Sequence, residues 1–171
     1  MTKITDMYTE LRFLRVLKLD GFRTKRTLCE EIGKLIHLKY LGLRESYVKR
    51  LPRPIINLRR LQTLDLFNSD TYVELPDEIS KLKELRHLFG KFHGNWEIDS
   101  LTKLQSLKYV SSTRWISIDT EKLGNLRELW IYGFFGSLEF RLDSVAKLER
   151  LEQLLVKLDR YDCFKSLQPL T

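Results

Sequence analysis

The chain has 171 residues, of which 43% are hydrophobic and 31% charged, and it carries a formal net charge of +7. This composition is that of a globular domain and excludes an intrinsically disordered chain. No stretch approaches the roughly 18 consecutive apolar residues of a membrane-spanning helix, and the N-terminus lacks a signal-peptide core. We therefore expect no membrane span and a cytoplasmic protein, with the nucleus as the alternative location.

The excess of basic residues could indicate nucleic-acid binding, which uses clustered Lys and Arg side chains to neutralise phosphates. Here the Lys and Arg residues are spread along the whole chain, in the polar positions between regularly spaced leucines. A solvated rim on a repetitive structure explains this spacing without any partner. We therefore expect no nucleic-acid partner.

A Leu-x-x-Leu-x-Leu phrase recurs along the chain and predicts a leucine-rich repeat domain. Successive phrases are separated by 19 to 25 residues, which is the period of such repeats. We expect an α/β fold, a right-handed solenoid shaped as a horseshoe arc of about seven repeats, with residues 1–13 as an N-terminal flank or partial cap and residues 14–171 as the repeat domain. The repeats start near Leu14, Leu38, Leu61, Leu85, Leu104, Leu126 and Leu151.

The second repeat shows how each unit should be built. Leu41 and Leu43 alternate with Tyr40, Gly42 and Arg44. This period of two predicts a short strand with one buried face. One such strand per repeat should pair in parallel with its neighbours and line the concave face.

The rest of each repeat should return along the convex face. Pro52 and Pro54 lack amide donors, so we expect loops and short helical turns there, and not a second regular strand. Pro76 stands at the same place in the third repeat as Pro52 does in the second, whereas the first repeat carries Cys29 there.

Repeats four and five depart from the pattern. Gly90 replaces the last strand leucine, and Tyr109 stands at a strand position that leucine occupies elsewhere. We interpret these as irregular repeats whose core is completed by other apolar residues. The expected substitutes are Phe92, Trp96, Ile98, Trp115, Ile116 and Ile118.

The residues between the framework leucines should project from the sheet, so they are the candidates for recognition. Three outward columns follow from the alternation; the second includes Asp65 and the third includes Val110. Aromatic and basic side chains on such a face are typical anchors of protein interfaces. The alternative is that the rings pack on one another and only cover the sheet. The candidate protein-binding residues are Tyr40, Arg44, Phe67, His87, Phe89, Lys91, Lys108, Trp130, Tyr132 and Lys157.

The chain offers no recognisable catalytic chemistry. Phosphate-loop, metalloprotease and serine-hydrolase motifs are absent. We expect no enzymatic activity, no cofactor and no metal, although a two-ligand pair of His87 and His93 remains the metal alternative. Cys29 and Cys163 fall in the first and last repeats, so we expect free thiols.

The residues between the framework leucines resemble those of a known family. The phrases IGKLIHLKYLGLR, which begins at Ile32, and ELPDEISKLKELRHL, which begins at Glu74, closely resemble the repeats of plant intracellular disease resistance receptors of the coiled-coil, nucleotide-binding class. The resemblance implies recognition of a pathogen effector or a guarded host protein, and restraint of the receptor's own nucleotide-binding domain. The alternatives are a leucine-rich-repeat adaptor or scaffold unconnected with defence and, more remotely, an enzyme inhibitor.

The resemblance also implies a larger receptor. No phosphate loop is present, so ADP or ATP would bind only to a nucleotide-binding module upstream of these repeats. The apolar residues Phe164, Leu167 and Leu170 continue toward the last residue without an obvious polar cap. We therefore expect the repeat portion of a longer receptor, or a truncated relative.

Overall fold

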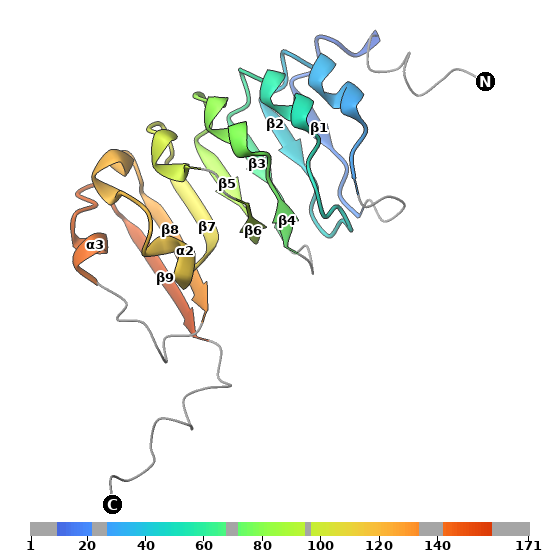
Figure 1. The fold of residues 1–171 in the computed structure, drawn as a ribbon. Helices are drawn as coiled ribbons and strands as arrows, with labels where there is room; N and C mark the ends of the chain where they lie inside the picture. Colours follow the sequence, from blue (N-terminus) through green and yellow to red (C-terminus); the bar gives the residue numbers. More distant parts are fainter. Residues whose placement is uncertain (1–9, 22–26, 68–71, 95–96, 134–141, 159–171) are drawn as a thin grey trace, which may run out of the picture.

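A computed structural model describes residues 10–21, 27–67, 72–94, 97–133 and 142–158. Within these ranges the strands lie side by side along one face of a solenoid, and short helical turns lie along the opposite face (Figure 1). The expectations for Trp96, Cys163, Phe164, Leu167 and Leu170 fall outside the described residues.

The main sheet has seven parallel strands in chain order, with one strand contributed by each repeat. The predicted α/β repeat solenoid is therefore confirmed. Matching leucines stand opposite each other, as in the pairs Leu17 with Leu41 and Leu41 with Leu64. The strands are β1 (Val16–Lys18), β2 (Tyr40–Gly42), β3 (Thr63–Asp65), β5 (His87–Phe89), β7 (Ser106–Ser111), β8 (Glu128–Gly133) and β9 (Gln153–Leu158).

The return segments are mostly short 3-10 helices, as predicted. Cys29, Pro52 and Pro76 precede the first three, with φ angles of −71°, −70° and −62°, so Cys29 adopts the conformation that proline fixes in its neighbours. The helices are η1 (Glu30–Lys34), η2 (Arg53–Asn57), η3 (Asp77–Lys81), η4 (Ile98–Ser100), η5 (Thr120–Leu123), α2 (Ser112–Trp115) and α3 (Leu142–Ala146).

A second, very short sheet corrects the expectation that the return contains no strand. β4 (Val73–Glu74) pairs in parallel with β6 (Phe92–His93), and Arg50 forms isolated parallel bridges with both Thr27 and Glu74. The prolines do not prevent this pairing because they follow the bridged residues, whose amides remain free to donate. The Glu74 amide, for example, donates to the Lys49 carbonyl.

The core is a single stack of apolar side chains between the sheet and the helical turns. Leu41, Leu64 and Leu88 of successive strands have no exposed surface, and Ile55 and Ile79 close the core from the helix side. Each such side chain contributes about 1.5–3 kcal/mol through burial. The leucine framework therefore holds the solenoid and leaves the outward residues free.

Most of the predicted core substitutes in the irregular repeats are confirmed. Trp115 is 1% exposed and donates from its indole nitrogen to the Ser144 hydroxyl, while Ile98 is buried and Phe92 and Ile118 pack against the core. The prediction for Ile116 is wrong. Its side chain is 44% exposed because successive residues of a helix point in different directions, so burial of Trp115 turns the next residue toward solvent.

A bulge in β7 changes the outward column that was predicted to contain Val110. Tyr109 has a positive φ of 68°, and the register with β8 shifts between Lys108 and Val110. A bulge adds one residue to a strand and thereby exchanges the faces of the residues that follow. Val110 is consequently buried in the core, and Ser111 takes its place opposite Tyr132. Tyr109 does not enter the core as a leucine substitute.

Candidate recognition face of the sheet

The outward residues of the sheet form columns whose register agrees with the predicted one as far as the bulge. Tyr40 pairs with Thr63, Thr63 with His87, and His87 with Ser106. Phe89, Lys108 and Trp130 pair in the next column. We call this outward surface of the seven strands the sheet face.

Three aromatic rings form a cluster on the sheet face. The centroids of Phe67 and Tyr109 are 5.1 Å apart, those of Tyr109 and Trp130 are 5.5 Å apart, and those of Phe67 and Trp130 are 6.5 Å apart. All three contacts are edge-to-face, the arrangement that ring quadrupoles favour. We call Phe67, Tyr109 and Trp130 the aromatic cluster. Each of its rings is half-buried, so the sequence-based expectation of exposed rings is corrected: they pack on one another and still present part of their surface.

Two cations border the aromatic cluster. The Lys108 ammonium lies 4.5 Å from the ring centroid of Trp130 and 5.1 Å from that of Phe89, and it also pairs with Glu128. The Arg44 guanidinium lies 5.8 Å from the ring of Phe67. Cation–π contacts of this kind hold the long basic side chains against the rings.

A buried carboxylate organises the neighbouring end of the sheet face. Asp65 is 1% exposed, and its Oδ2 accepts hydrogen bonds from the Tyr40 hydroxyl at 2.9 Å and from Arg44 Nε at 2.7 Å. Its Oδ1 accepts from the backbone amide of Phe67 at 3.1 Å. Burial and the bond to Asp65 raise the pKa of Tyr40 to about 12. Sequence reasoning placed Asp65 among the variable outward residues and missed this role.

A glycine makes that arrangement possible. Gly42 lies beneath the Tyr40 ring, and a Cβ atom at this position would come within 2.9 Å of Tyr40 Cε1 and 3.2 Å of Asp20 Oδ1. The absence of a side chain therefore lets Tyr40 lie across the neighbouring residue toward Asp65. A glycine between an outward Tyr and an outward Arg was the signal that could have revealed the contact.

The remaining candidates lie around this centre. Tyr132 packs against Tyr72, with ring centroids 6.3 Å apart, and the Lys91 ammonium lies 5.8 Å from the Tyr132 ring. Lys157 is exposed and pairs in register with Tyr132. The predicted residues thus share one face, on which Lys91 lies over the Tyr132 ring and Lys157 lies on the last strand.

His87 is half-buried on the same face, and its Nδ1 lies 3.1 Å from the Ser106 hydroxyl. Burial lowers the pKa of His87 below its ordinary value of 6.5. His93 belongs to β6 of the small sheet, whereas His87 belongs to the main sheet. In the described part of the chain no three His, Cys, Asp or Glu residues are placed to hold a metal ion.

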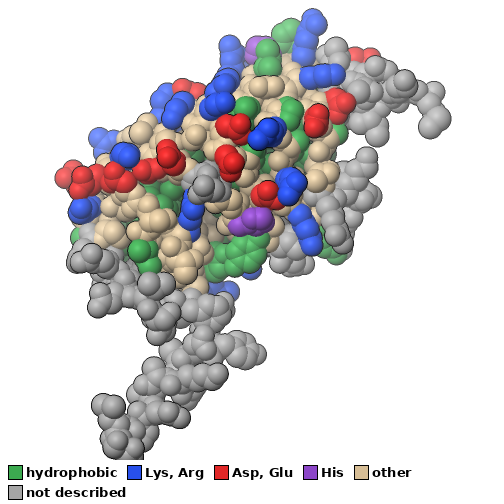
Figure 2. All heavy atoms as spheres, in the orientation of Figure 1, with side chains coloured by type: hydrophobic (Ala, Val, Ile, Leu, Met, Phe, Trp, Pro, Cys, Tyr) green, Lys and Arg blue, Asp and Glu red, His purple; other side chains and the backbone are tan. Residues whose placement is uncertain are grey.

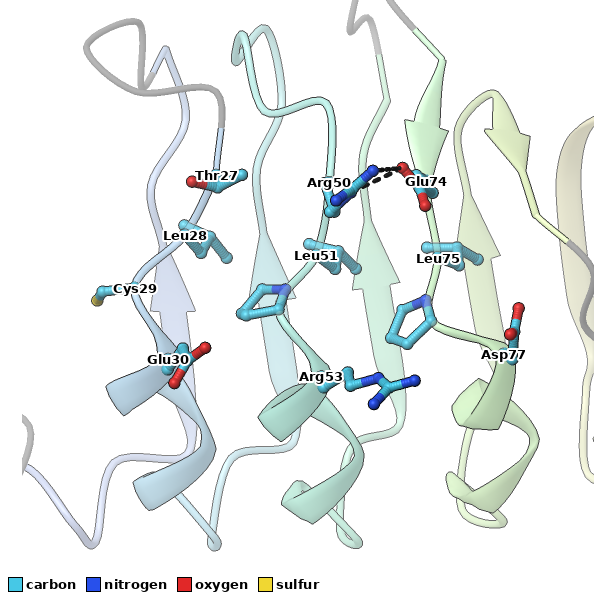
Figure 3. Close-up of a pocket in the computed structure, with 12 residues that line it drawn as sticks. Thr27, Leu28, Cys29, Glu30, Arg50, Leu51, Arg53, Glu74, Leu75 and Asp77 are labelled. Atoms are coloured by element: carbon cyan, nitrogen blue, oxygen red, sulfur yellow. Dashed lines mark hydrogen bonds and ion pairs between the residues drawn. The ribbon is translucent and has the colours of Figure 1, made fainter.

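A separate groove of about 520 Å³ crosses the return segments of the first three repeats, where each segment enters its 3-10 helix (Figure 3). Each of the three repeats contributes one leucine to the floor of the groove, namely Leu28, Leu51 and Leu75. An ion pair of 2.7 Å between Arg50 and Glu74 crosses the rim. The groove mixes both signs of charge and exposes no aromatic ring among its lining residues. We therefore regard the sheet face as the stronger recognition site.

A parallel-stranded solenoid with short helical returns and variable outward side chains is a leucine-rich repeat domain, a fold used for protein interaction. The family model described as "leucine-rich repeat region" matches residues 2–170. The chain belongs to this family. Among the described residues, no helix is long and apolar enough to cross a membrane.

The relatives at the sequence level are plant proteins. RPP13-like protein 3 of Arabidopsis thaliana is 43% identical over 128 residues, which are 72% of this chain and 15% of that protein. Disease resistance protein RPP13 of the same plant is 40% identical over 128 residues, with the same coverage of 72% and 15%. These relatives confirm the resemblance to disease resistance proteins. The chain spans less than a fifth of the length of either.

Solved structures agree on the fold. A leucine-rich repeat protein of Leptospira interrogans aligns with a TM-score of 0.69 at 23% identity, covering 90% of this chain and 40% of that one. The plant peptide hormone receptor RGFR1, solved in complex with RGF2, aligns with a TM-score of 0.59 at 32% identity, covering 90% of this chain and 26% of the receptor.

Proposed function

We propose that this chain is the recognition module of a plant disease resistance receptor, and that its sheet face binds a pathogen effector or a host protein guarded by the receptor. The repeats would also help to keep the receptor inactive through contact with its nucleotide-binding domain. The observation that carries the proposal is the half-buried aromatic cluster, bordered by Arg44 and Lys108.

The physical properties of the aromatic cluster support a protein partner. Rings that already pack on one another lose little conformational freedom on binding, and Trp, Tyr and Arg are the residues that most often carry the energy of protein interfaces. Seven parallel strands at a spacing of about 4.8 Å span about 29 Å, which is wide enough for a protein surface. The disease resistance relatives and the peptide-bound receptor RGFR1 support the same choice of partner class.

The test is a binding screen of the 171-residue chain against two panels, one of secreted pathogen effectors with the host proteins they modify, and one of host signalling proteins unrelated to defence. We expect binders from the first panel, and binding that is lost on Tyr109→Ala/Trp130→Ala. Binders from the second panel alone would favour an adaptor outside defence. Binding that survives the double substitution would place the interface elsewhere.

A further inference from the structure

A small basic pocket lies at the edge of the first three repeats, where the chain turns into each strand. It has a volume of about 270 Å³ and is lined by Phe13, Arg15, His37, Lys39 and Arg60. No carboxylate is among these lining residues. In Figure 2, Lys and Arg side chains gather along the upper edge of the molecule, while acidic side chains gather over the C-terminal repeats at the left.

The backbone that carries the pocket is held by the repeat structure. The Lys39 amide donates to the Arg15 carbonyl at 2.8 Å, and the Gln62 amide donates to the Lys39 carbonyl at 2.8 Å. The turns of three successive repeats are therefore stacked in register. Arg15 and Lys39 occupy equivalent positions in the first two turns, whereas the equivalent residue of the third turn is Gln62, and Arg60 stands where the second turn has His37. The stacked turns bring the positive charges of Arg15, Lys39 and Arg60 around a single hollow.

The two residues of the pocket that carry rings, His37 and Phe13, are also positioned. Arg60 Nη1 lies 3.1 Å from His37 Nδ1, and because a guanidinium only donates, Nδ1 must be the acceptor. A neutral His37 ring then carries its proton on Nε2, which adds a donor. Phe13 stacks on this ring with centroids 5.5 Å apart and an interplanar angle of 28°, and Phe13 is 68% exposed.

We propose that this pocket binds a phosphorylated side chain of a partner protein, a role distinct from that of the sheet face. A phosphate monoester carries a charge of about −1.5 to −2 and three acceptor oxygens, which match three cations and a ring N–H better than the single charge of a carboxylate. The pocket volume suits one functional group and is small for a free drug-sized ligand.

The surroundings favour a peptide as the carrier of that phosphate. Phe13, which lines the basic pocket, is an exposed apolar side chain, and its near neighbour in the sequence Leu11 and the His37 neighbour Ile36 are exposed as well, at 40% and 52%. Residues that flank a phosphorylated side chain would contact this apolar surface, whereas a free phosphate or a polyphosphorylated sugar would leave it unused. A basic pocket next to exposed apolar side chains therefore favours a phosphorylated peptide over a free phosphate or a polyphosphorylated sugar.

The test uses the 171-residue chain and fluorescence polarisation with a degenerate hexapeptide library that carries one central phosphoserine. Serine and aspartate versions of the library, inorganic phosphate and inositol hexakisphosphate serve as competitors. We expect the phosphoserine library to bind at least about tenfold more tightly than the other two libraries. Lys39→Ala and Arg60→Ala should each weaken that binding by about tenfold.

Arg59→Ala is the matched control, because it removes the same charge from the same exposed turn. Arg59 directly precedes Arg60 but does not line the pocket. It should change the affinity by less than about twofold. Equal losses for Arg59→Ala and Arg60→Ala, equal binding of the aspartate library, or binding of inositol hexakisphosphate alone would each overturn the proposal.

Discussion

The hydroxyl of Tyr40 on β2 donates a hydrogen bond of 2.9 Å to the buried carboxylate of Asp65 on β3. Burial and this carboxylate raise the pKa of Tyr40 from 10.0 to about 12. Folding then favours the protonated tyrosine, so this contribution to stability is complete below pH 10 and is lost as the pH rises from about 10 to about 12. A difference ultraviolet titration of the chain and its Tyr40→Phe variant should show a phenol that ionises near pH 12. Ionisation near pH 10 would contradict the contact.

The same carboxylate gives a prediction about stability. Asp65→Asn leaves Arg44 without its ion pair and weakens the acceptor of Tyr40, so we expect the free energy of unfolding to fall by about 1–3 kcal/mol in urea denaturation. Glu74→Gln is the matched control. Its carboxylate pairs with Arg50 at the same 2.7 Å, but its side chain is 38% exposed whereas that of Asp65 is 1% exposed.

Solvent screening should keep the loss for Glu74→Gln below about 0.5 kcal/mol. A larger loss for Glu74→Gln than for Asp65→Asn would mean that burial does not determine how much these two ion pairs contribute to the free energy of unfolding.

His87 gives the second pH dependence. Burial lowers its pKa below 6.5, so the folded state resists protonation, and this contribution to stability is present above pH 6.5 and is lost as the pH falls below that value. An NMR titration of the imidazole should give a midpoint below 6.5. Between pH 7.5 and 5.5 the wild-type chain should lose more stability than His87→Gln, whose side chain does not ionise. Identical losses would mean that His87 is solvated in the folded state.

The space around two glycines of the helical turns predicts different effects of substitution by alanine. A Cβ atom at Gly33 would lie 2.6 Å from both Cβ and the carbonyl oxygen of Pro54, neither of which is flexible. We expect Gly33→Ala to lower the free energy of unfolding by about 1–3 kcal/mol. At Gly124 no atom lies within 4 Å, and its φ of −60° suits alanine, so Gly124→Ala should be neutral or slightly stabilising. Chemical denaturation of both variants checks this, and equal losses would contradict the close contact at Pro54.

The spacing of the leucines was sufficient to predict the main sheet and its register as far as Lys108. Parallel strands from successive repeats have no freedom to slip when one face of each is buried, so pattern and register coincide. At Val110 the prediction failed because a bulge depends on the backbone angle of Tyr109, and tyrosine is not a residue that signals a positive φ. The predicted register holds again between β8 and β9, where Trp130 pairs with Leu155 and Tyr132 with Lys157.

The candidate site was only partly predictable for a different reason. The alternation of leucines with other residues along each strand identifies which side chains point away from the core, and it correctly placed Phe67 and Trp130 on the sheet face. It does not reveal contacts between outward side chains of neighbouring repeats, which depend on side-chain rotamers. The buried position of Asp65, and the packing of Tyr109 between two rings, therefore appear only in the structure.

The central claim is that the aromatic cluster, and not the helix side, binds the protein partner. The most direct measurement is the dissociation constant of the partner from the screen, determined by calorimetry for wild type, Tyr109→Ala/Trp130→Ala, and Lys34→Ala/Asn57→Ala on exposed positions of η1 and η2. Thermal melting confirms that each variant is folded, and Lys108→Ala tests the cation without removing a ring. We predict a loss of at least about 100-fold, roughly 2.7 kcal/mol, for the ring variant and less than about twofold for the helix-side variant. A folded ring variant that binds as tightly as wild type would contradict the account.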